Sequence, residues 1–213
     1  VAAKFPDLEF IDVVNEAIWD GNNYHSGYSK PAQGAEGIST DDPDCGGTYI
    51  IPALGGDEVI GGKHQYNFVK TAFEMARERW PHAKLIYNDY NTLSWQMNEG
   101  IEMVKTLVAN GAPIDFYGQQ SHDCKGMSKS DFESKLTRIH NDTGLPLLIS
   151  EYDIGEADDQ KQKNDYANQI PFMWETPWIG GITIWGYING ATWAANTGIM
   201  ESDGRKRAAM GWL

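Results

Sequence analysis

Short apolar segments recur along this chain at nearly constant spacing, which narrows the folds open to it. Four of them centre on Ile86, Phe116, Leu148 and Thr183, so successive centres lie 30, 32 and 35 residues apart. An interval of that length accommodates a strand and a helix, whereas a hairpin needs far fewer residues. The spacing therefore predicts consecutive strand–helix units around a parallel sheet, which is an α/β fold.

Five segments have the composition of buried strands, because they combine branched and aromatic residues in short runs. They are residues 10–14, 84–87, 114–117, 147–149 and 182–185. Helical periodicity predicts four helices between them, at residues 64–80, 95–110, 130 onward and 158–175. The third begins with a predicted capping box at Ser130–Glu133, in which Ser130 is the first capping residue. Residues 20–62 lack steady periodicity and read as a long loop.

The charge of the chain favours a neutral ligand. Seventeen basic residues stand against thirty acidic ones, a formal net charge of −13. Such a field repels nucleic-acid phosphates and anionic membrane surfaces, so neither partner is expected. No run of eighteen apolar residues occurs, and residues 1–4 lack the regions of a signal peptide, so the chain is interpreted as mature or cut.

The two cysteines, Cys45 and Cys124, have neither CxxC spacing nor a histidine at metal-ligand distance in the sequence. A zinc site is therefore not expected, and the sequence implies no metal and no cofactor. A disulfide between the two cysteines and a pair of free thiols both remain compatible with the sequence.

Polar residues follow every predicted strand. They are Asn15–Glu16, Asn88–Asn91, Gln119–His122, Ser150–Asp153 and Trp185–Gly186. In a parallel barrel the carboxyl ends of the strands meet at one edge and build the active site. Such a fold would bring Glu16 and Glu151 together despite their separation in sequence, and a carboxyl pair suits glycoside hydrolysis. The alternative is that each glutamate is an ordinary solvated or ion-paired residue at a strand end.

Ordered motifs make the chain resemble glycoside hydrolase family 10. The acid/base motif of that family, Trp-Asp-Val-Val-Asn-Glu-Ala, appears as Ile11–Ala17 with only the leading Trp changed. The nucleophile motif, Thr-Glu-Leu-Asp-Ile, appears as Ser150–Ile154. Motifs of the fifth, sixth and eighth strands of the family are matched, in order, by residues 85–91, 120–122, and 181–186 followed by Trp193.

The resemblance implies a (β/α)8 TIM barrel and endo-acting, retaining cleavage of the β-1,4 bonds of xylan. It implies that Glu151 is the nucleophile, with its carboxylate held ionised and oriented by His122, and that Glu16 is the general acid/base. Xylan or a xylo-oligosaccharide would be the ligand, bound by Asn15, Tyr90, Gln120, His122, Trp185 and Trp193. Core packing is the alternative role for the aromatic residues, and the residues after Trp193 depart from the Arg or Lys usual in the family.

In the family the acid/base glutamate closes the fourth strand, so residues 1–213 are expected to be a single partial catalytic domain supplying strands 4–8. A part-barrel leaves unpaired strand edges, so the missing N-terminal part of the barrel is the expected partner and a requirement for activity. Secretion is expected because the substrate is a polymer too large to enter a cell. The alternatives are a non-catalytic carbohydrate-binding remnant and a related retaining β-glucanase.

Overall fold

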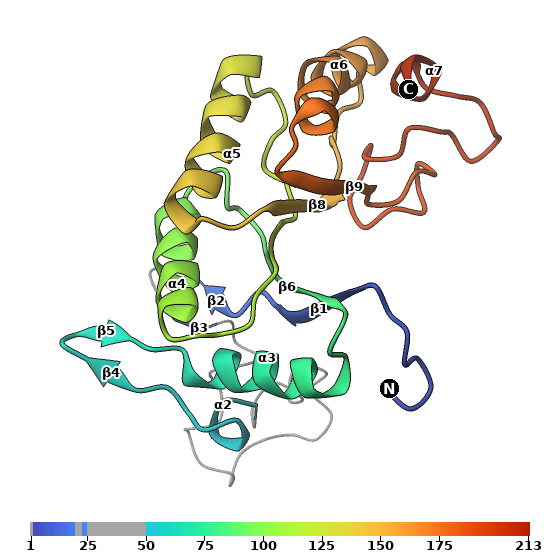
Figure 1. The fold of residues 1–213 in the computed structure, drawn as a ribbon. Coiled ribbons are helices and arrows are strands. Elements are labelled where there is room, and N and C mark those ends of the chain that lie inside the picture. Colours follow the sequence, from blue (N-terminus) through green and yellow to red (C-terminus); the bar gives the residue numbers. More distant parts are fainter. Residues whose placement is uncertain (1, 20–22, 25–49) are drawn as a thin grey trace, which may run out of the picture. The chain divides into compact units, whose positions relative to one another are not determined.

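The computed structural model describes residues 2–19, 23–24 and 50–213 of the chain (Figure 1). The chain divides into two compact units, of which the first comprises residues 1–89 and 98–117 and the second residues 90–97 and 118–213. Among the described residues, no helix combines the length and the apolar character needed to cross a bilayer.

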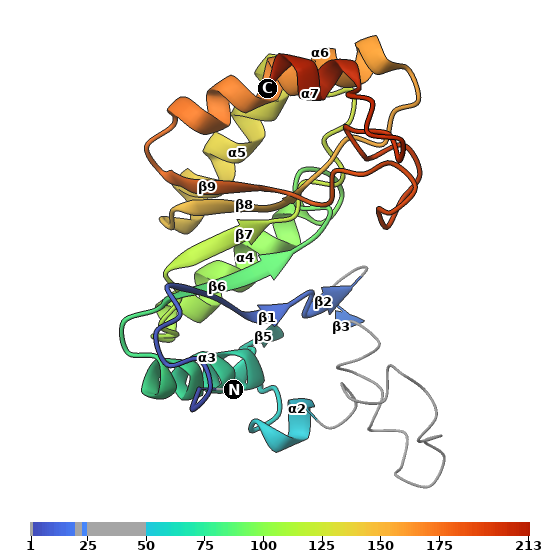
Figure 2. The ribbon, with the colours of Figure 1, turned by 90° about the vertical axis from the view of Figure 1, so that its right-hand side faces the viewer.

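The first unit is built on a parallel pair of strands, β1 (Phe10–Asn15) and β6 (Lys84–Asp89). The register pairs Phe10 with Lys84 and Asn15 with Asn88, and it shifts once, between Asp12 and Val14. Helix α3 (Asn67–Arg79) lies along one side of both strands in Figures 1 and 2. Its buried residues pack with the interior of β6 and form the core of this unit: Phe68, Val69, Phe73, Ala76, Leu85, Ile86 and Tyr87.

Short elements complete the first unit. They are β2 (Ile18–Trp19), β3 (Asn23–Tyr24), α2 (Ile50–Ala53), β4 (Val59–Ile60) and β5 (Lys63–His64). Helix α4 (Met97–Ala109) follows β6, and all of it except Met97 belongs to this unit. The predicted loop over residues 20–62 therefore carries regular structure where it is described. The rest of that loop, including Cys45, lies outside the described residues.

The second unit contains a second parallel pair, β8 (Leu147–Tyr152) and β9 (Ile179–Ile184). Helices α5 (Lys129–Thr143), α6 (Asp159–Glu175) and α7 (Ala208–Trp212) lie on the same side of these strands in Figure 2. Strand β7 (Phe116–Gln119) is where the chain passes from the first unit to the second. From β6 to β9, strands and helices alternate along the chain as the spacing predicted.

The starts of helices α5 and α6 can be compared with their predicted positions. Helix α5 is capped by Ser128, whose side chain accepts a hydrogen bond from the Asp131 amide, so the capping box predicted at Ser130 was wrong by two residues. Ser128 and Asp131 have the same three-residue spacing as the predicted pair, and this explains the ambiguity. Helix α6 begins as predicted, because the Asp158 carboxylate accepts from the amides of Gln160 and Lys161.

Candidate active site

In the first unit, the parallel pairing of β1 and β6 places Asn15 and Glu16 beside the end of β6. The Glu16 amide donates to the Asn88 carbonyl at 2.9 Å, and the Asn88 side-chain amide donates to the Asn15 oxygen at 2.8 Å. Glu16 has a φ of 55°, in the left-handed region that few residues other than glycine adopt. A strained backbone at a polar strand end supports a functional role for this residue.

Beneath this strand end, Tyr87 and Asp89 form a buried pair on β6. The Tyr87 hydroxyl donates to Asp89 Oδ2 at 2.5 Å, and both residues are almost fully buried. Burial, followed by the charge of Asp89, raises the pKa of Tyr87 well above its ordinary value, so the hydroxyl keeps its proton and remains a donor. The pair lies on β6 at the end of the strand that pairs with Asn15.

In the second unit, His122 bridges two carboxylates at the carboxyl end of β8. Its Nε2 lies 3.3 Å from Glu151 Oε2, and its Nδ1 lies 2.9 Å from Asp153 Oδ1. Glu151 belongs to β8 and Asp153 follows that strand directly, while His122 comes from the turn after β7. The side chains of His122, Glu151 and Asp153 are 15%, 13% and 2% exposed, so the cluster is largely shielded from water.

The two carboxylates determine the charge of His122. Burial alone would lower its pKa, but the hydrogen bonds that His122 donates to Asp153 and Glu151, and then the charges of these carboxylates, outweigh burial and raise the pKa of His122 to about 9. At neutral pH the imidazole is therefore a cation and donates from both nitrogens. Glu151 accepts one of these hydrogen bonds through Oε2, which fixes the direction of its carboxylate.

Trp193 closes the other side of this cluster. Its indole Nε1 donates to Asp153 Oδ2 at 2.5 Å, and its ring centroid lies 4.8 Å from that of His122. Trp193 nevertheless remains 65% exposed, so it contributes a hydrogen bond to the cluster and an aromatic surface to solvent. Exposed aromatic rings of this kind suit stacking against the apolar faces of sugars.

Other predicted binding residues lie at the ends of their strands in the same unit. Trp185 follows β9, is 43% exposed, and its amide donates to the Tyr152 carbonyl at 3.0 Å. Gln120 follows β7 and is buried, while Tyr90 lies in the segment after β6 and contacts the exposed Trp95 edge-on at 6.1 Å. The structure thus links Trp193 to Asp153, Asp153 to His122, and His122 to Glu151, and it has Trp185, Gln120 and Tyr90 at separate strand ends.

Within the described part of the chain, no group of three or more His, Cys, Asp or Glu side chains is arranged to hold a metal ion. Cys124 is a buried free cysteine whose Sγ donates to the Ser121 carbonyl at 2.8 Å, and burial raises the pKa of its thiol. Because Cys45 lies outside the described residues, the structure does not test the two alternatives from the sequence, a Cys45–Cys124 disulfide and a pair of free thiols.

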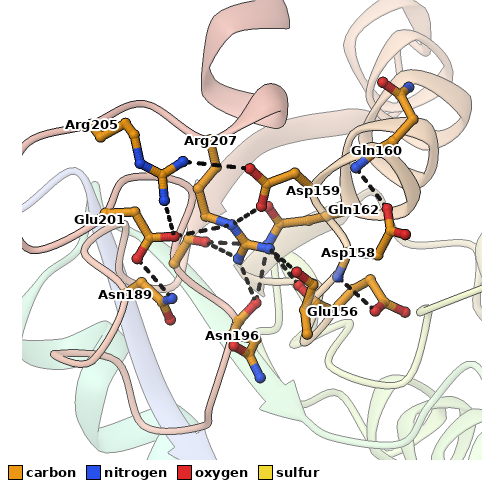
Figure 3. A network of polar contacts seen from close by, with 12 residues as sticks. Glu156, Asp158, Asp159, Gln160, Gln162, Asn189, Asn196, Glu201, Arg205 and Arg207 are labelled. Carbon is orange, nitrogen blue, oxygen red and sulfur yellow. Dashed lines mark hydrogen bonds and ion pairs between the residues drawn. The ribbon is translucent and has the colours of Figure 1, made fainter.

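Sequence reasoning missed Arg207, which is 2% exposed and lies at the centre of a polar network in the second unit (Figure 3). The pattern Arg205–Lys206–Arg207 is typical of a solvated surface turn, and Arg205 has that environment. A single sequence contains no signal that distinguishes the two arginines.

The alternation of strands and helices, with carboxylates, amides and exposed aromatic rings at the strand ends, is typical of barrel-type glycoside hydrolases. The sequence profile of Glycosyl hydrolase family 10 matches residues 1–212. The chain belongs to this family.

Curated relatives support this membership. Endo-1,4-beta-xylanase B of Cellvibrio japonicus is 35% identical over 211 residues, which are 99% of this chain and 29% of that protein. Endo-1,4-beta-xylanase A of Phanerodontia chrysosporium is 32% identical over 139 residues, covering 62% of this chain and 34% of that protein. The chain thus spans about a third of the length of these relatives.

Solved structures show the fold. Native xylanase 10B from Thermotoga maritima matches with a TM-score of 0.71 and 22% identity, over 99% of this chain and 60% of that chain. Xylanase 10B from Thermotoga petrophila RKU-1, solved in complex with xylobiose, matches with a TM-score of 0.70 and 23% identity, over 94% and 57%. The fold is therefore that of part of a (β/α)8 barrel, as predicted from the sequence.

Proposed function

We propose that this chain is the part of a retaining endo-β-1,4-xylanase that carries both catalytic carboxyls, with Glu151 as nucleophile and Glu16 as general acid/base. The observation that carries the proposal is the His122 bridge, which holds Glu151 by a charged hydrogen bond at the carboxyl end of β8. Membership of the family and the xylanase names of its relatives support the substrate class.

In this mechanism Glu151 attacks the anomeric carbon while Glu16 protonates the leaving oxygen, which gives a covalent glycosyl-enzyme. Glu16 then removes a proton from water, and the water displaces Glu151 with overall retention of configuration. In the active protein we expect the two carboxyls to lie about 5–5.5 Å apart, the separation of retaining enzymes. Asn15, beside Glu16, would hydrogen-bond the sugar 2-hydroxyl.

We propose xylan or a xylo-oligosaccharide as the ligand. The complex of the Thermotoga petrophila relative with xylobiose supports that class of sugar. Trp185, Trp193 and Tyr90 would stack on xylose rings, and Gln120 would hydrogen-bond their hydroxyls. Because the polymer is too large to enter a cell, we also propose that the protein acts outside it.

We propose that activity requires three further βα units, which complete the barrel. Exposed apolar residues at the start of the first unit support a covering segment there, since Phe5, Leu8 and Phe10 are 49%, 38% and 46% exposed. The curated and solved relatives are also longer than this chain. We call the protein in which residues 1–213 are preceded by three βα units of the Cellvibrio japonicus relative the completed barrel.

The completed barrel is expected to cleave xylan at least about tenfold faster than residues 1–213 alone, because substrate-positioning groups on the added strands contribute to catalysis. Release of reducing ends from xylan, measured for both forms at equal concentration, checks this. Equal rates for the two forms would show that the added units are dispensable. No cleavage by either form would contradict the proposed function.

Two other functions compete with this one. A retaining β-glucanase would cleave mixed-linkage β-glucan faster than xylan, so the ratio of the two initial rates separates the two enzymes. A carbohydrate-binding remnant would bind xylo-oligosaccharides without cleaving them, and Glu151→Ala would leave its behaviour unchanged. The charged hydrogen bond between His122 and Glu151 favours an enzyme, since sugar binding alone does not require an oriented carboxylate.

A further inference from the structure

Arg207 is an arginine buried in the second unit that uses every N–H group of its side chain. Its Nε lies 2.7 Å from Asp159 Oδ1, while its two terminal nitrogens donate only to backbone carbonyls. The acceptors are Asn196 and Gly198, at 3.1 and 2.8 Å, and Glu156 and Ala157, at 2.6 and 3.4 Å. Figure 3 shows these bonds converging on the guanidinium. An arginine has five N–H donors, and all five are accounted for here.

These acceptors belong to two segments that are far apart in sequence. One is the segment after β8, residues 154–157, and the other is the loop after β9, residues 193–198, called here the Trp193 loop. Buried Gln162 joins the same two segments, because its Nε2 donates to the carbonyls of Ile154, Asn196 and Gly198 at 3.0, 3.1 and 3.2 Å. The Glu156 amide adds a direct bond to the Asn196 carbonyl at 3.2 Å.

The Trp193 loop has little room to shift. A Cβ added at Gly198 would lie 2.2 Å from the backbone nitrogen of Asn189, a separation that packed atoms do not reach. Gly155, in the segment after β8, faces the Ala195 carbonyl, with 3.5 Å available to a Cβ. The tight contact fixes Gly198 against Asn189, while the two segments are joined to each other by the Glu156–Asn196 backbone bond and by the Arg207 and Gln162 side chains.

Both segments lead directly into the candidate active site. The segment after β8 continues from Asp153, and the Trp193 loop begins with the residue whose indole donates to Asp153. Asp153 in turn accepts from His122, which bonds Glu151. Whatever holds the two segments together thus also holds the Trp193–Asp153 contact in place.

We propose that Arg207 is a positioning residue for the nucleophile side of the site: by tying the Trp193 loop to the segment after β8, it keeps Trp193 on Asp153 and thereby His122 on Glu151. Its catalytic consequence rests on the proposed function. Asp159 and Glu201 neutralise the buried guanidinium, with Nε–oxygen distances of 2.7 and 3.7 Å. Lysine would keep the charge, but its single ammonium group cannot span acceptors on both segments.

The test compares Arg207→Lys with Arg205→Lys. Arg205 reaches the same two carboxylates, at 3.8 Å from Asp159 and 3.4 Å from Glu201, but its side chain is 61% exposed and makes no bond to either segment. Arg205→Lys is therefore expected to behave as the wild type. In the completed barrel, Arg207→Lys is expected to lower kcat on xylan by about tenfold, since small misplacements of catalytic groups have effects of this size or more.

A second measurement, on residues 1–213, follows the NMR titration of the His122 imidazole. Its signal is assigned with His122→Gln. In Arg207→Lys the pKa of His122 is expected to fall by about one unit, toward its ordinary value, because a loosened site weakens the bonds that raise it. Trp193→Phe, which removes the indole N–H donor to Asp153 and leaves a smaller aromatic ring beside His122, should give a shift of the same sign.

The outcomes are separable. If the wild type cleaves xylan and Arg207→Lys matches Arg205→Lys in both kcat and the His122 titration, the inference is wrong. If the wild type does not cleave xylan, the proposed function fails, and the titration still decides whether Arg207 positions His122. If Arg207→Lys does not fold, Trp193→Phe must shift the titration, and an unchanged titration overturns the inference.

A double-mutant cycle distinguishes positioning from a general loss of stability. If Arg207 acts through Trp193, the substitution Arg207→Lys should lower kcat by less than about threefold in a Trp193→Phe background, because the contact it supports is already lost. Full additivity of the two effects on kcat would contradict the proposed route through Trp193.

Discussion

Glu151→Ala is expected to lower kcat on xylan by at least about 10⁴-fold in the completed barrel, because the covalent route needs the carboxylate that His122 orients. Glu16→Ala is expected to lower it by about 10²–10⁴-fold, the usual contribution of a general acid/base. On an aryl xylobioside with a good leaving group, Glu16→Ala should retain the first step, since that leaving group needs no proton.

Azide separates the two roles by stereochemistry. In Glu151→Ala, azide enters the vacated space and attacks the activated glycoside from the nucleophile's face, so the product is the α-glycosyl azide. In Glu16→Ala, azide attacks the glycosyl-enzyme from the opposite face and gives the β-glycosyl azide. Proton NMR of the products identifies the anomer in each case.

Glu175→Ala is the matched control, since Glu175 is an exposed glutamate at the end of α6, and it should retain wild-type activity. Exchanged anomers in the two azide products would reverse the assignment of Glu16 and Glu151. Undiminished xylan cleavage by Glu151→Ala would contradict the proposed nucleophile.

The second large effect is expected from His122→Gln, which removes the cation between Glu151 and Asp153. We expect kcat to fall by about 10²-fold, because a charged donor that orients a reacting group contributes about this much. The stability of the second unit should also change its dependence on pH. The folded pKa of about 9 exceeds the ordinary value of about 6.5, so the wild type gains stability from His122 below pH 6.5 and loses it as pH rises toward 9.

The difference in unfolding free energy between pH 6 and pH 9.5 should therefore be larger in the wild type than in His122→Gln. The rise in the pKa of His122 on folding, from about 6.5 to about 9, corresponds to on the order of 3 kcal/mol of unfolding free energy, at about 1.4 kcal/mol per pKa unit. Urea unfolding at the two pH values measures it. His82→Gln, which alters an exposed histidine, serves as control and should follow the wild type. A parallel pH dependence in the wild type and His122→Gln would show that His122 does not carry the extra charge.

The strand–helix alternation could be predicted from the sequence because apolar segments and their spacing are local properties. Glu151 and His122 could be singled out because each follows or ends such a segment. The contact between them has no local signal, since His122 lies 29 residues before Glu151. It was implied only by the resemblance to the family, and the structure has it. The sequence also could not decide whether Ser128 or Ser130 caps α5, because both serines are followed by an acidic residue three positions later.

The burial of Arg207 could not be predicted from the sequence either. Arg205 and Arg207 are two residues apart and chemically identical, yet one is exposed and the other is enclosed by carbonyls from two distant segments. The environment of Arg207 arises only when the loop after β9 folds back on the segment after β8. Such long-range polar contacts leave no periodic signal in a single sequence.

The left-handed backbone of Glu16 has a consequence for evolution. Glycine adopts this conformation without the steric cost that a side chain incurs, about 1–2 kcal/mol. Glu16→Gly would therefore relieve strain at the residue to which we assign proton transfer. Libraries of this protein selected only for heat resistance should accumulate inactive survivors at position 16, so each round of selection has to include turnover of the polysaccharide.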